Sequence, residues 1–376
     1  MDIHRLVFDA RAILQAARRW VEVESPSWDA VAVSRMAELA GAELQALGAQ
    51  VRRIAGRNGY GDCVLGDFAP GDPAPGILIL GHLDTVHAAG SLAGPVPWRE
   101  EAGRCYGPGL FDMKSGNVMA LEALRQIRAA GWRTRLPVRV LFTSDEESGS
   151  PSTRTLIEEI AKQQRYVLVP EGAQHGGRIV SGRFPSCRLR LWTRGRPSHA
   201  LLQREQGRSA ILAMAQVIQR IEALNDGDVS CTVTYLEAGR TVATVPVESY
   251  AELVCTTRST DGLERAIEAV RDIMRDDPGT ELEVQIKTQR PLWLPSPADI
   301  ALRQHAEGLG RSIGLELRSE AAFGGSDGNF TGALGIPTLD ELGAVGADAH
   351  QLTESIELAS LVPRTRLMAG LLATLA

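Results

Sequence analysis

The segment Gly76-Ile-Leu-Ile-Leu-Gly-His-Leu-Asp84 decides the fold class of this chain. Residues 77–81 form a continuous apolar run that ends at His82, the pattern of a strand buried on both faces of a sheet. Similar short apolar runs alternate with segments of helical periodicity. The runs lie at residues 63–66, 138–143 and 167–169, and the helical segments at 118–130 and 151–164. This alternation predicts an α/β domain whose sheet is covered by helices on both faces.

Two helix boundaries are marked in the sequence. A helical pattern spans residues 29–47, and Gly48 follows where a helix is expected to stop. Ser150 and Pro151 are an N-cap residue followed by a proline at the first helical position, so they predict the start of the 151–164 helix.

The pattern changes after residue 177, where elements follow in the order strand, helix, strand, strand, helix, strand. They are expected at residues 178–193, 205–224, 231–237, 245–256, 261–275 and 281–288. This βαββαβ order is typical of a ferredoxin-like domain. Prolines then mark a linker, and α/β patterning returns. We therefore expect an α/β domain in two parts, residues 1–177 and 291–376, interrupted by an inserted ferredoxin-like domain at residues 178–290.

Composition excludes several classes of protein. The 376 residues are 44% hydrophobic with a formal net charge of −6, which suits a globular protein and not a nucleic-acid-binding one. No apolar run approaches the ~20 residues of a membrane helix, and the N-terminus does not resemble a signal peptide. The five cysteines lie far apart and form no CxxC pair. They are Cys63, Cys105, Cys187, Cys231 and Cys255. We expect free thiols in a soluble, cytoplasmic protein with no membrane partner.

Acidic and imidazole side chains gather where predicted strands end and in two Gly-containing segments. They are His82 and Asp84, Asp112, Asp145 to Glu147, Glu171 and His350. The carboxyl ends of strands in an open α/β sheet form its ligand-binding crevice. Several carboxylates that converge there would repel one another without a cation between them. Imidazole and carboxylate ligands without thiolates suit zinc, or alternatively cobalt or manganese.

Several short motifs give the chain a resemblance to a known family. They are GHLDTV at 81–86, GPGLFDMKSG at 107–116, SDEESG at 144–149, PEG at 170–172, SHA at 198–200, GGSD at 324–327 and AH at 349–350. In this order they resemble the di-zinc family of glutamate carboxypeptidases, aminoacylases, acetylornithine deacetylases and succinyl-diaminopimelate desuccinylases. The resemblance spans nearly the whole chain, and residues 326–337 are most similar to the glutamate carboxypeptidase branch.

The resemblance implies a zinc-peptidase-like catalytic domain that holds two Zn²⁺ ions per chain, with Co²⁺ or Mn²⁺ as possible replacements. Asp112 would bridge the two ions. His82 and Glu171 would complete one site, and Glu147 and His350 would complete the other.

The resemblance also implies roles around the metals. Asp84 would hydrogen-bond His82 and fix its tautomer. Glu146 would be the general base, because zinc lowers the pKa of a bound water to about 7 and a neighbouring carboxylate can take the proton. His199, in the inserted domain, would steady the oxyanion in the active site of a partner subunit. The inserted domain would then be a lid and dimerisation domain of a homodimer.

Two basic residues, one beside a motif and one within a motif, receive no metal role. His87 is expected to be a loop or surface histidine and not a ligand. Lys114 is expected to support the turn after Asp112, without a catalytic role.

The inserted domain departs from the family pattern where relatives contact substrate. Leu201 replaces a glycine, Ala243 replaces an asparagine, and Cys255 aligns with an arginine that grips the substrate carboxylate. One interpretation is a shifted alignment or a substitute arginine, Arg240 or Arg258. The other is a changed substrate. The substrate-pocket candidates are Leu201, Ala243, Cys255, Gly325 and Ser326.

The expected function is therefore that of a di-zinc metallohydrolase that cleaves an amide bond of an N-acyl amino acid or small peptide. Metal-bound hydroxide would be the nucleophile, and Glu146 the general base. The alternative is an aminoacylase- or deacetylase-type amidohydrolase whose substrate lacks a free α-carboxylate.

Two further alternatives come from other classes. Ser326 lies in a G-x-S-x-G pattern, with Asp340 or Asp348 and then His350 in the chain order of a serine-hydrolase triad. The preceding strand pattern is weak and Pro337 follows soon, which disfavours this interpretation. A binding protein that has lost catalysis is disfavoured by the intact set of ligands and base.

Overall fold

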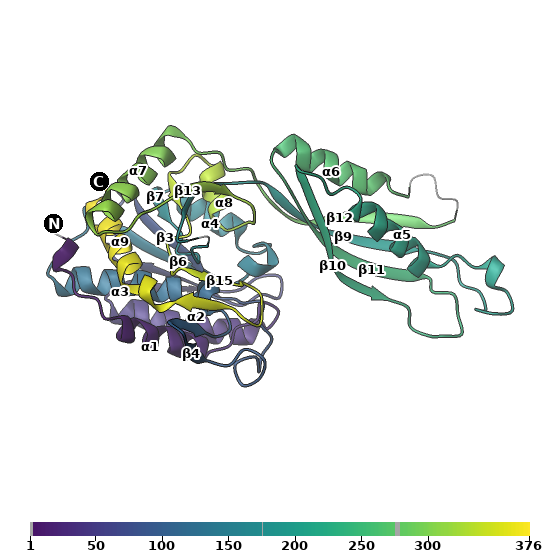
Figure 1. Cartoon of the computed structure of the whole chain (residues 1–376), viewed down its shortest axis with the longest axis horizontal. Helices are drawn as coiled ribbons and strands as arrows, with labels where there is room; N and C mark the ends of the chain where they lie inside the picture. The colour runs from purple at the N-terminus through teal and green to yellow at the C-terminus, as the bar shows by residue number, and fades with distance from the viewer. Residues whose placement is uncertain (1–2, 175, 275–278) are drawn as a thin grey trace. The chain divides into compact units, whose positions relative to one another are not determined.

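The computed structural model describes residues 3–174, 176–274 and 279–376. The chain divides into two compact units, each with its own hydrophobic core (Figure 1). Unit 1 comprises Met1–Gly182, Leu294–Ala322 and Ser326–Ala376, and unit 2 comprises Arg183–Trp293 and Phe323–Gly325. The boundaries expected from the sequence lie after residues 177 and 290, within a few residues of those of the structure.

Unit 1 is built on a six-stranded mixed sheet in the order β1-β2-β6-β3-β7-β14. The last four strands run parallel, and β1 and β2 form an antiparallel edge. The strands are β1 (Gln50–Ile54), β2 (Cys63–Asp67), β3 (Gly76–His82), β6 (Val138–Thr143), β7 (Gln164–Leu168) and β14 (Thr338–Leu339). The four strands predicted from apolar runs are confirmed. Strand β1 was missed because it is a half-exposed edge strand with no continuous apolar run.

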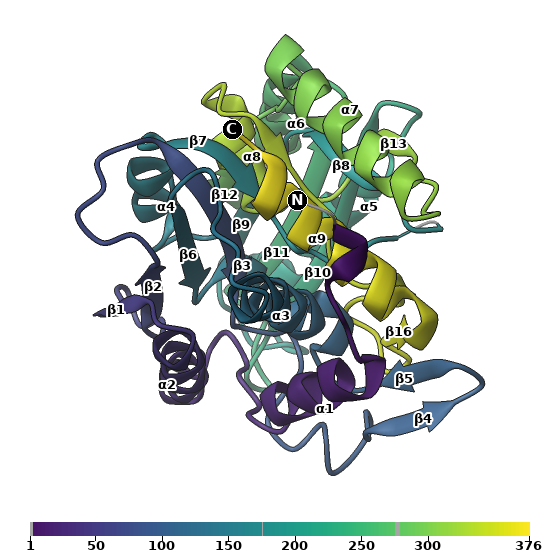
Figure 2. The same ribbon diagram turned by 90° about the vertical axis from the view of Figure 1, so that its left-hand side faces the viewer.

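Helices cover both faces of this sheet, as predicted, and β3 shows why. Every residue of β3 is buried. Because side chains alternate along a strand, Ile77 and Ile79 join one hydrophobic cluster and Leu78 and Leu80 another. The first cluster includes α1 (Ala10–Val21), α2 (Ala30–Ala46), α3 (Ser115–Ala129), α7 (Pro297–Ser312) and α9 (Leu361–Thr374), and the second includes α4 (Arg154–Ala161) and α8 (Gly328–Ala333) (Figure 2).

The structure confirms one of the two predicted helix boundaries and shifts the other. Helix α2 agrees with the prediction, because Asp29 caps its first turn and Gly48 follows it with a φ of 86°. Helix α4 begins later than predicted, at Arg154, and Ser150 does not cap it. The Ser150 hydroxyl instead donates to the carboxylate of Asp327. Within the part of the chain that the structure describes, no helix combines the length and apolar character that crossing a bilayer requires.

A second sheet in unit 1 joins distant parts of the chain, in the order β15-β16-β5-β4. Its strands are β4 (Arg99–Glu101), β5 (Arg104–Tyr106), β15 (Gly346–Ala347) and β16 (Ser355–Glu357). The antiparallel pairing of Ser355 with Tyr106 brings the loop before β16 beside the segment after β5. Sequence periodicity did not predict these short strands.

Unit 2 contains one antiparallel sheet in the order β10-β11-β9-β12, with helices that pack on one face. Its elements are β9 (Ser186–Arg194), α5 (Ala210–Glu222), β10 (Val229–Ala238), β11 (Glu248–Thr257), α6 (Thr260–Asp272) and β12 (Glu281–Arg290). This is the element order that the sequence predicts. The predicted end of the second helix at Arg275 lies outside the described residues.

The long strand predicted at 178–193 is wrong, because two strands occupy this segment. Strand β8 (Ile179–Arg183) pairs with β13 (Ser319–Ala322) in unit 1, and β9 starts the sheet of unit 2. Pro185 lies at the break, where a residue without a backbone N–H cannot continue a ladder of hydrogen bonds.

Two of the five cysteines are not free thiols. Cys231 of β10 lies directly opposite Cys255 of β11, and a disulfide joins them with a Cα–Cα distance of 4.1 Å. The expectation of free thiols is therefore wrong for this pair, whereas Cys63, Cys105 and Cys187 are free and buried. The pairing depends on the β10–β11 register, which the spacing of cysteines in the sequence does not show.

Candidate metal centre

The five predicted metal ligands lie together in unit 1. His82 ends β3, Glu147 follows β6, and Glu171 follows β7, so parallel strands present all three at one edge of the sheet. Asp112 comes from a tight turn after β5, and His350 comes from the loop before β16. The β5–β16 pairing brings these last two segments together.

Asp112 lies between the two histidines and offers one oxygen to each. Its Oδ1 is 3.1 Å from Nε2 of His82, and its Oδ2 is 3.0 Å from Nε2 of His350. The same nitrogen of His82 is 3.6 Å from Glu171 Oε1, and that of His350 is 3.0 Å from Glu147 Oε2. Tetrahedral zinc with bonds of 2.0–2.1 Å separates neighbouring ligand atoms by about 3.3 Å. The donor set therefore fits divalent metal.

The pKa values show how strongly these side chains interact. Burial and then the charge of Asp112 raise the pKa of Glu147 to about 8, and the same two causes raise the pKa of Glu171 well above its usual value. Burial opposes a charged His350, yet hydrogen bonds to Asp112 and Glu147 raise its pKa to about 11. A cluster with this excess of carboxylates is one that a divalent cation stabilises.

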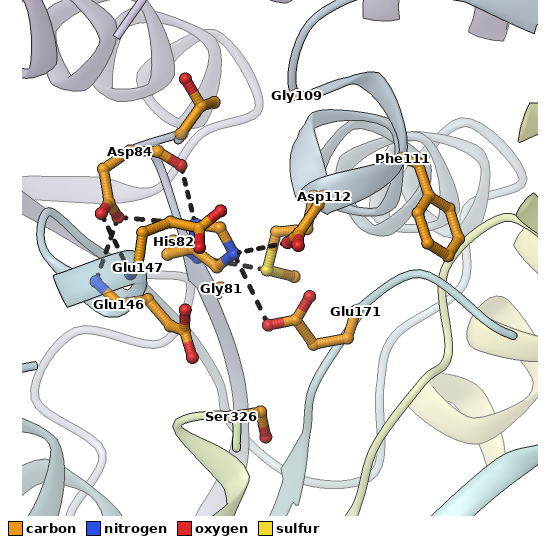
Figure 3. Close-up of polar contacts among 12 residues, drawn as sticks. Gly81, His82, Asp84, Gly109, Phe111, Asp112, Glu146, Glu147, Glu171 and Ser326 are labelled. Carbon is orange, nitrogen blue, oxygen red and sulfur yellow. Dashed lines mark hydrogen bonds and ion pairs between the residues drawn. The ribbon is translucent and has the colours of Figure 1, made fainter. Parts of the chain in front are cut away.

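Asp84 connects His82 to the turn that carries the two glutamates. Nδ1 of His82 is 2.9 Å from the main-chain carbonyl of Asp84 and 3.5 Å from its carboxylate, so the carbonyl is the nearer partner. The Asp84 carboxylate accepts the backbone N–H groups of Glu146 and Glu147, each at 3.1 Å (Figure 3). A proton on Nδ1 leaves the Nε2 lone pair of His82 directed at Asp112.

Glu146 and Glu147 are adjacent but direct their carboxylates to different places (Figure 3). Glu147 reaches His350. The charge of Glu146 is among the causes that raise the pKa of both Glu147 and Glu171. Glu146 is only 8% exposed. A buried carboxylate beside the ligands has the position that a general base requires.

Two motif glycines lie where a Cβ would meet a neighbouring residue. A Cβ on Gly116 would lie 1.8 Å from the carbonyl oxygen of Pro170, so glycine lets the start of α3 pack against the residue before Glu171. A Cβ on Gly325 would lie 2.2 Å from Cδ of Arg290. Gly325 is thus a packing residue of unit 2.

The turn that carries Asp112 has features that its motif did not reveal. The peptide bond between Asp112 and Met113 is cis. Lys114 is buried and its Nζ donates to the carbonyl of Val23 at 2.7 Å, which anchors the turn as expected. Burial lowers the pKa of Lys114 to about 7.

Glu354 is a residue of the site that the sequence motifs do not indicate. It is 1% exposed, and its carboxylate accepts the backbone N–H groups of Gly109, Phe111 and Asp112. His87 also contacts this carboxylate; it lies in a loop, as one of the two expected alternatives, but is buried and not at the surface. The only sequence signal was an acidic residue four positions after the last candidate ligand.

Three of the remaining candidates lie together in unit 2. His199 forms an isolated antiparallel β-bridge with Thr244. The backbone N–H of Ala200 donates to the carbonyl of Ala243 at 3.0 Å. Leu201 is 86% exposed, and its N–H donates to Nδ1 of His199 at 3.3 Å.

The assignment of Cys255 to a substrate pocket is wrong. Its side chain is 1% exposed within the core of unit 2, whereas the neighbouring Val254 points to the other face of the sheet. A one-residue difference along a strand moves a side chain to the opposite face. Of the two candidate arginines, Arg258 pairs with Asp228 at 3.3 Å and stacks 5.1 Å from the ring of Phe323.

The geometry does not support Ser326 as a nucleophile. The residue is 1% exposed, and its hydroxyl donates to Asp340 and accepts the N–H of Gly328. The serine of a Ser-His-Asp triad needs a histidine that takes its proton. The candidate for that role, His350, instead directs Nε2 at Asp112.

Comparison with known sequences finds relatives along most of the chain. Carboxypeptidase G2 of Pseudomonas sp. (strain RS-16) is 27% identical over 370 residues, 96% of this chain and 88% of the relative. A succinyl-diaminopimelate desuccinylase of Acidovorax ebreus is 26% identical over 314 residues, 76% of this chain and 77% of the relative.

Solved structures share the fold. Human carnosine dipeptidase 1 superposes with a TM-score of 0.79 at 16% identity, covering 97% of this chain and 96% of that one. An M20 family metallo-carboxypeptidase of Sulfolobus solfataricus gives a TM-score of 0.76 at 16% identity, covering 96% and 98%. The family profile described as "Peptidase family M20/M25/M40" matches residues 78–374. The resemblance drawn from the motifs is confirmed, and the chain belongs to peptidase family M20/M25/M40, a family of metallopeptidases and amidohydrolases.

Proposed function

We propose that this protein is a two-metal hydrolase that cleaves an amide bond of an N-acyl amino acid or a small peptide. One observation carries the proposal: Asp112 offers a separate carboxylate oxygen to each of two histidines, and each histidine has a glutamate of its own. Shared between two sets of ligands in this way, a carboxylate can bridge two ions.

In this proposal His82 and Glu171 hold one ion, and Glu147 and His350 hold the other. Bound zinc, with cobalt or manganese as substitutes, supplies Lewis-acid chemistry and lowers the pKa of a bound water. Glu146 takes the proton of the attacking water and later passes it to the leaving amine. The carbonyl of Asp84 orients His82, and the Asp84 carboxylate holds the turn that carries Glu146.

The substrate class rests on the names of the relatives. A carboxypeptidase and a desuccinylase support a substrate that is a peptide or an N-acylated amino acid. The alternative, a substrate without a free α-carboxylate, was inferred from Cys255 and Ala243. Because Cys255 lies in the core of unit 2, only Ala243 still supports that alternative, and the free acid is the favoured form.

A substrate panel tests the function. Protein loaded with zinc, cobalt or manganese is incubated with N-acyl amino acids, dipeptides and the matching C-terminal amides. We expect hydrolysis of at least one free acid, loss of the activity on chelation, and recovery when metal is added back. Metal retention without turnover of any compound would favour a binding protein. Activity that survives complete chelation would contradict metal catalysis.

Unit 2 is proposed to act as a ferredoxin-like lid and dimerisation domain of a homodimer. Support comes from its βαββαβ element order and its single antiparallel sheet. In this arrangement His199 of one subunit steadies the oxyanion in the site of the other.

Mixing two inactive variants tests the role of His199. We expect His199→Ala and Glu146→Gln proteins to regain part of the wild-type rate when mixed, because some hybrid dimers contain one site with both residues intact. The rate is measured after subunit exchange has been demonstrated with labelled protein. No recovery after exchange would place His199 within its own subunit's site or outside catalysis.

A further inference from the structure

The turn that carries Asp112 satisfies only part of its own backbone, as where the N–H of Lys114 donates to the carbonyl of Gly109. Asp112 (φ −118°, ψ 92°) and Met113 (φ −130°, ψ 32°) are not helical, and Gly109 has a left-handed φ of 67°. Backbone N–H groups in such a turn lack the partners that a regular helix supplies. Each buried N–H therefore needs an acceptor from elsewhere in the fold.

Glu354 supplies that acceptor to three of these groups. Its Oε1 accepts the N–H of Phe111 at 2.8 Å and of Asp112 at 3.1 Å, and its Oε2 accepts the N–H of Gly109 at 3.1 Å. The Glu354 carboxylate is 1% exposed, so water does not compete for these bonds. Nε2 of His87 contacts Oε2 as a fourth partner.

Glu354 also connects the two segments that the proposed bridge requires. It lies four residues after His350, in a loop where Asp348 and His350 have left-handed φ angles of 62° and 66°. One side chain thus joins the loop of His350 to the turn of Asp112. The two oxygens of Asp112 must reach different histidines at 3.1 and 3.0 Å, so a small rotation of the turn would misplace at least one of them.

We propose that Glu354 is a positioning residue of the metal centre. Through the backbone of residues 109–112, and with His87 holding its carboxylate, it sets the orientation in which Asp112 faces both ligand sets. This inference rests on the proposed function. Glu354 is neither a metal ligand nor the general base. Its effect would be on how Asp112 is oriented, not on which atoms bind the metal.

Zinc affinity of Glu354→Gln tests the inference. Glutamine keeps the shape of the side chain but replaces one carboxylate oxygen with an NH₂ group, which cannot accept the N–H bonds made at that position. We expect the dissociation constant for zinc, measured by competition with a chromogenic chelator, to rise about 10–100-fold, the usual cost of losing an outer partner of a metal site.

Asp299→Asn is the matched control. Asp299 is also fully buried, and its carboxylate accepts the N–H groups of Ser296 at 2.8 Å and Thr338 at 2.9 Å, at the start of α7. The substitution should lower the thermal unfolding midpoint and leave zinc affinity unchanged. A merely structural role for Glu354 would make the two variants alike in both measurements.

A second variant, His87→Gln, keeps Glu354 and removes the imidazole that holds it. We expect a smaller rise in the zinc dissociation constant, and this variant decides the question if Glu354→Gln does not fold. Wild-type zinc affinity in the folded variants, or an equal loss in Asp299→Asn, would overturn the inference and leave the proposed function standing. Wild-type protein that binds no metal would instead overturn the proposed function.

Discussion

Glu146→Gln is expected to keep its metal and to lose about 10²–10⁴-fold in kcat, the usual contribution of general acid–base catalysis. The amide has the size of the carboxylate but cannot take a proton from water. Glu146 is buried beside Glu147 and Glu171, so the substitution also removes one of the charges that raise their pKa values. Steady-state kinetics and elemental analysis of the same preparation measure the two effects.

The adjacent Glu147→Gln substitution is the matched control, because it makes the same chemical change one residue along the chain. Glu147 Oε2 lies 3.0 Å from Nε2 of His350, so this variant should lose metal from one site. Glu146→Gln should retain the wild-type metal content. A Glu146→Gln enzyme with the wild-type rate would show that another group is the base.

Asp112→Ala is expected to reduce the metal content from about two equivalents per chain towards none, and to abolish turnover. A carboxylate that faces both histidines belongs to both ligand sets, so its removal weakens both. Asp112→Asn keeps the shape and removes the charge, which tests whether charge or position dominates. Inductively coupled plasma mass spectrometry of protein purified without chelator provides the metal content.

Asp145→Asn serves as the control for Asp112→Ala. Asp145 is fully buried near the site, but its carboxylate accepts the N–H of Ser152 and the hydroxyl of Thr153. Its substitution should therefore leave the metal content unchanged. One ion retained at wild-type affinity in Asp112→Ala would assign Asp112 to a single site.

The central strands could be predicted because burial on both faces leaves a strong local signal. Strands β3 and β6 are continuous apolar runs, and their ends locate His82 and the Glu146-Glu147 pair. The edge strand β1 has no such signal because its side chains remain partly exposed. Local periodicity thus reveals a strand where burial is continuous, as in β3, or alternates, as in β9, and β1 has neither pattern.

Two predictions from the sequence were wrong because of alignment and strand register. Cys255 was assigned to a pocket because a position in sequence was equated with a direction in space. Strand β11 directs Cys255 into the core, where it meets Cys231, 24 positions earlier in the sequence, across a register that the sequence does not reveal. The prediction of one strand at 178–193 was wrong because the chain breaks there into β8 and β9, which belong to two different sheets.

The sequence by itself determined the family, the residue types of the metal centre and the strand ends that carry most of them. These follow from chemistry and periodicity within short segments, where covalent spacing limits the geometry. Only the tertiary structure decided that Glu354 and His87, 267 residues apart, form a buried pair, and that β16 brings the loop of His350 beside Asp112. Such contacts depend on strand register and packing across the whole unit, which no local pattern encodes.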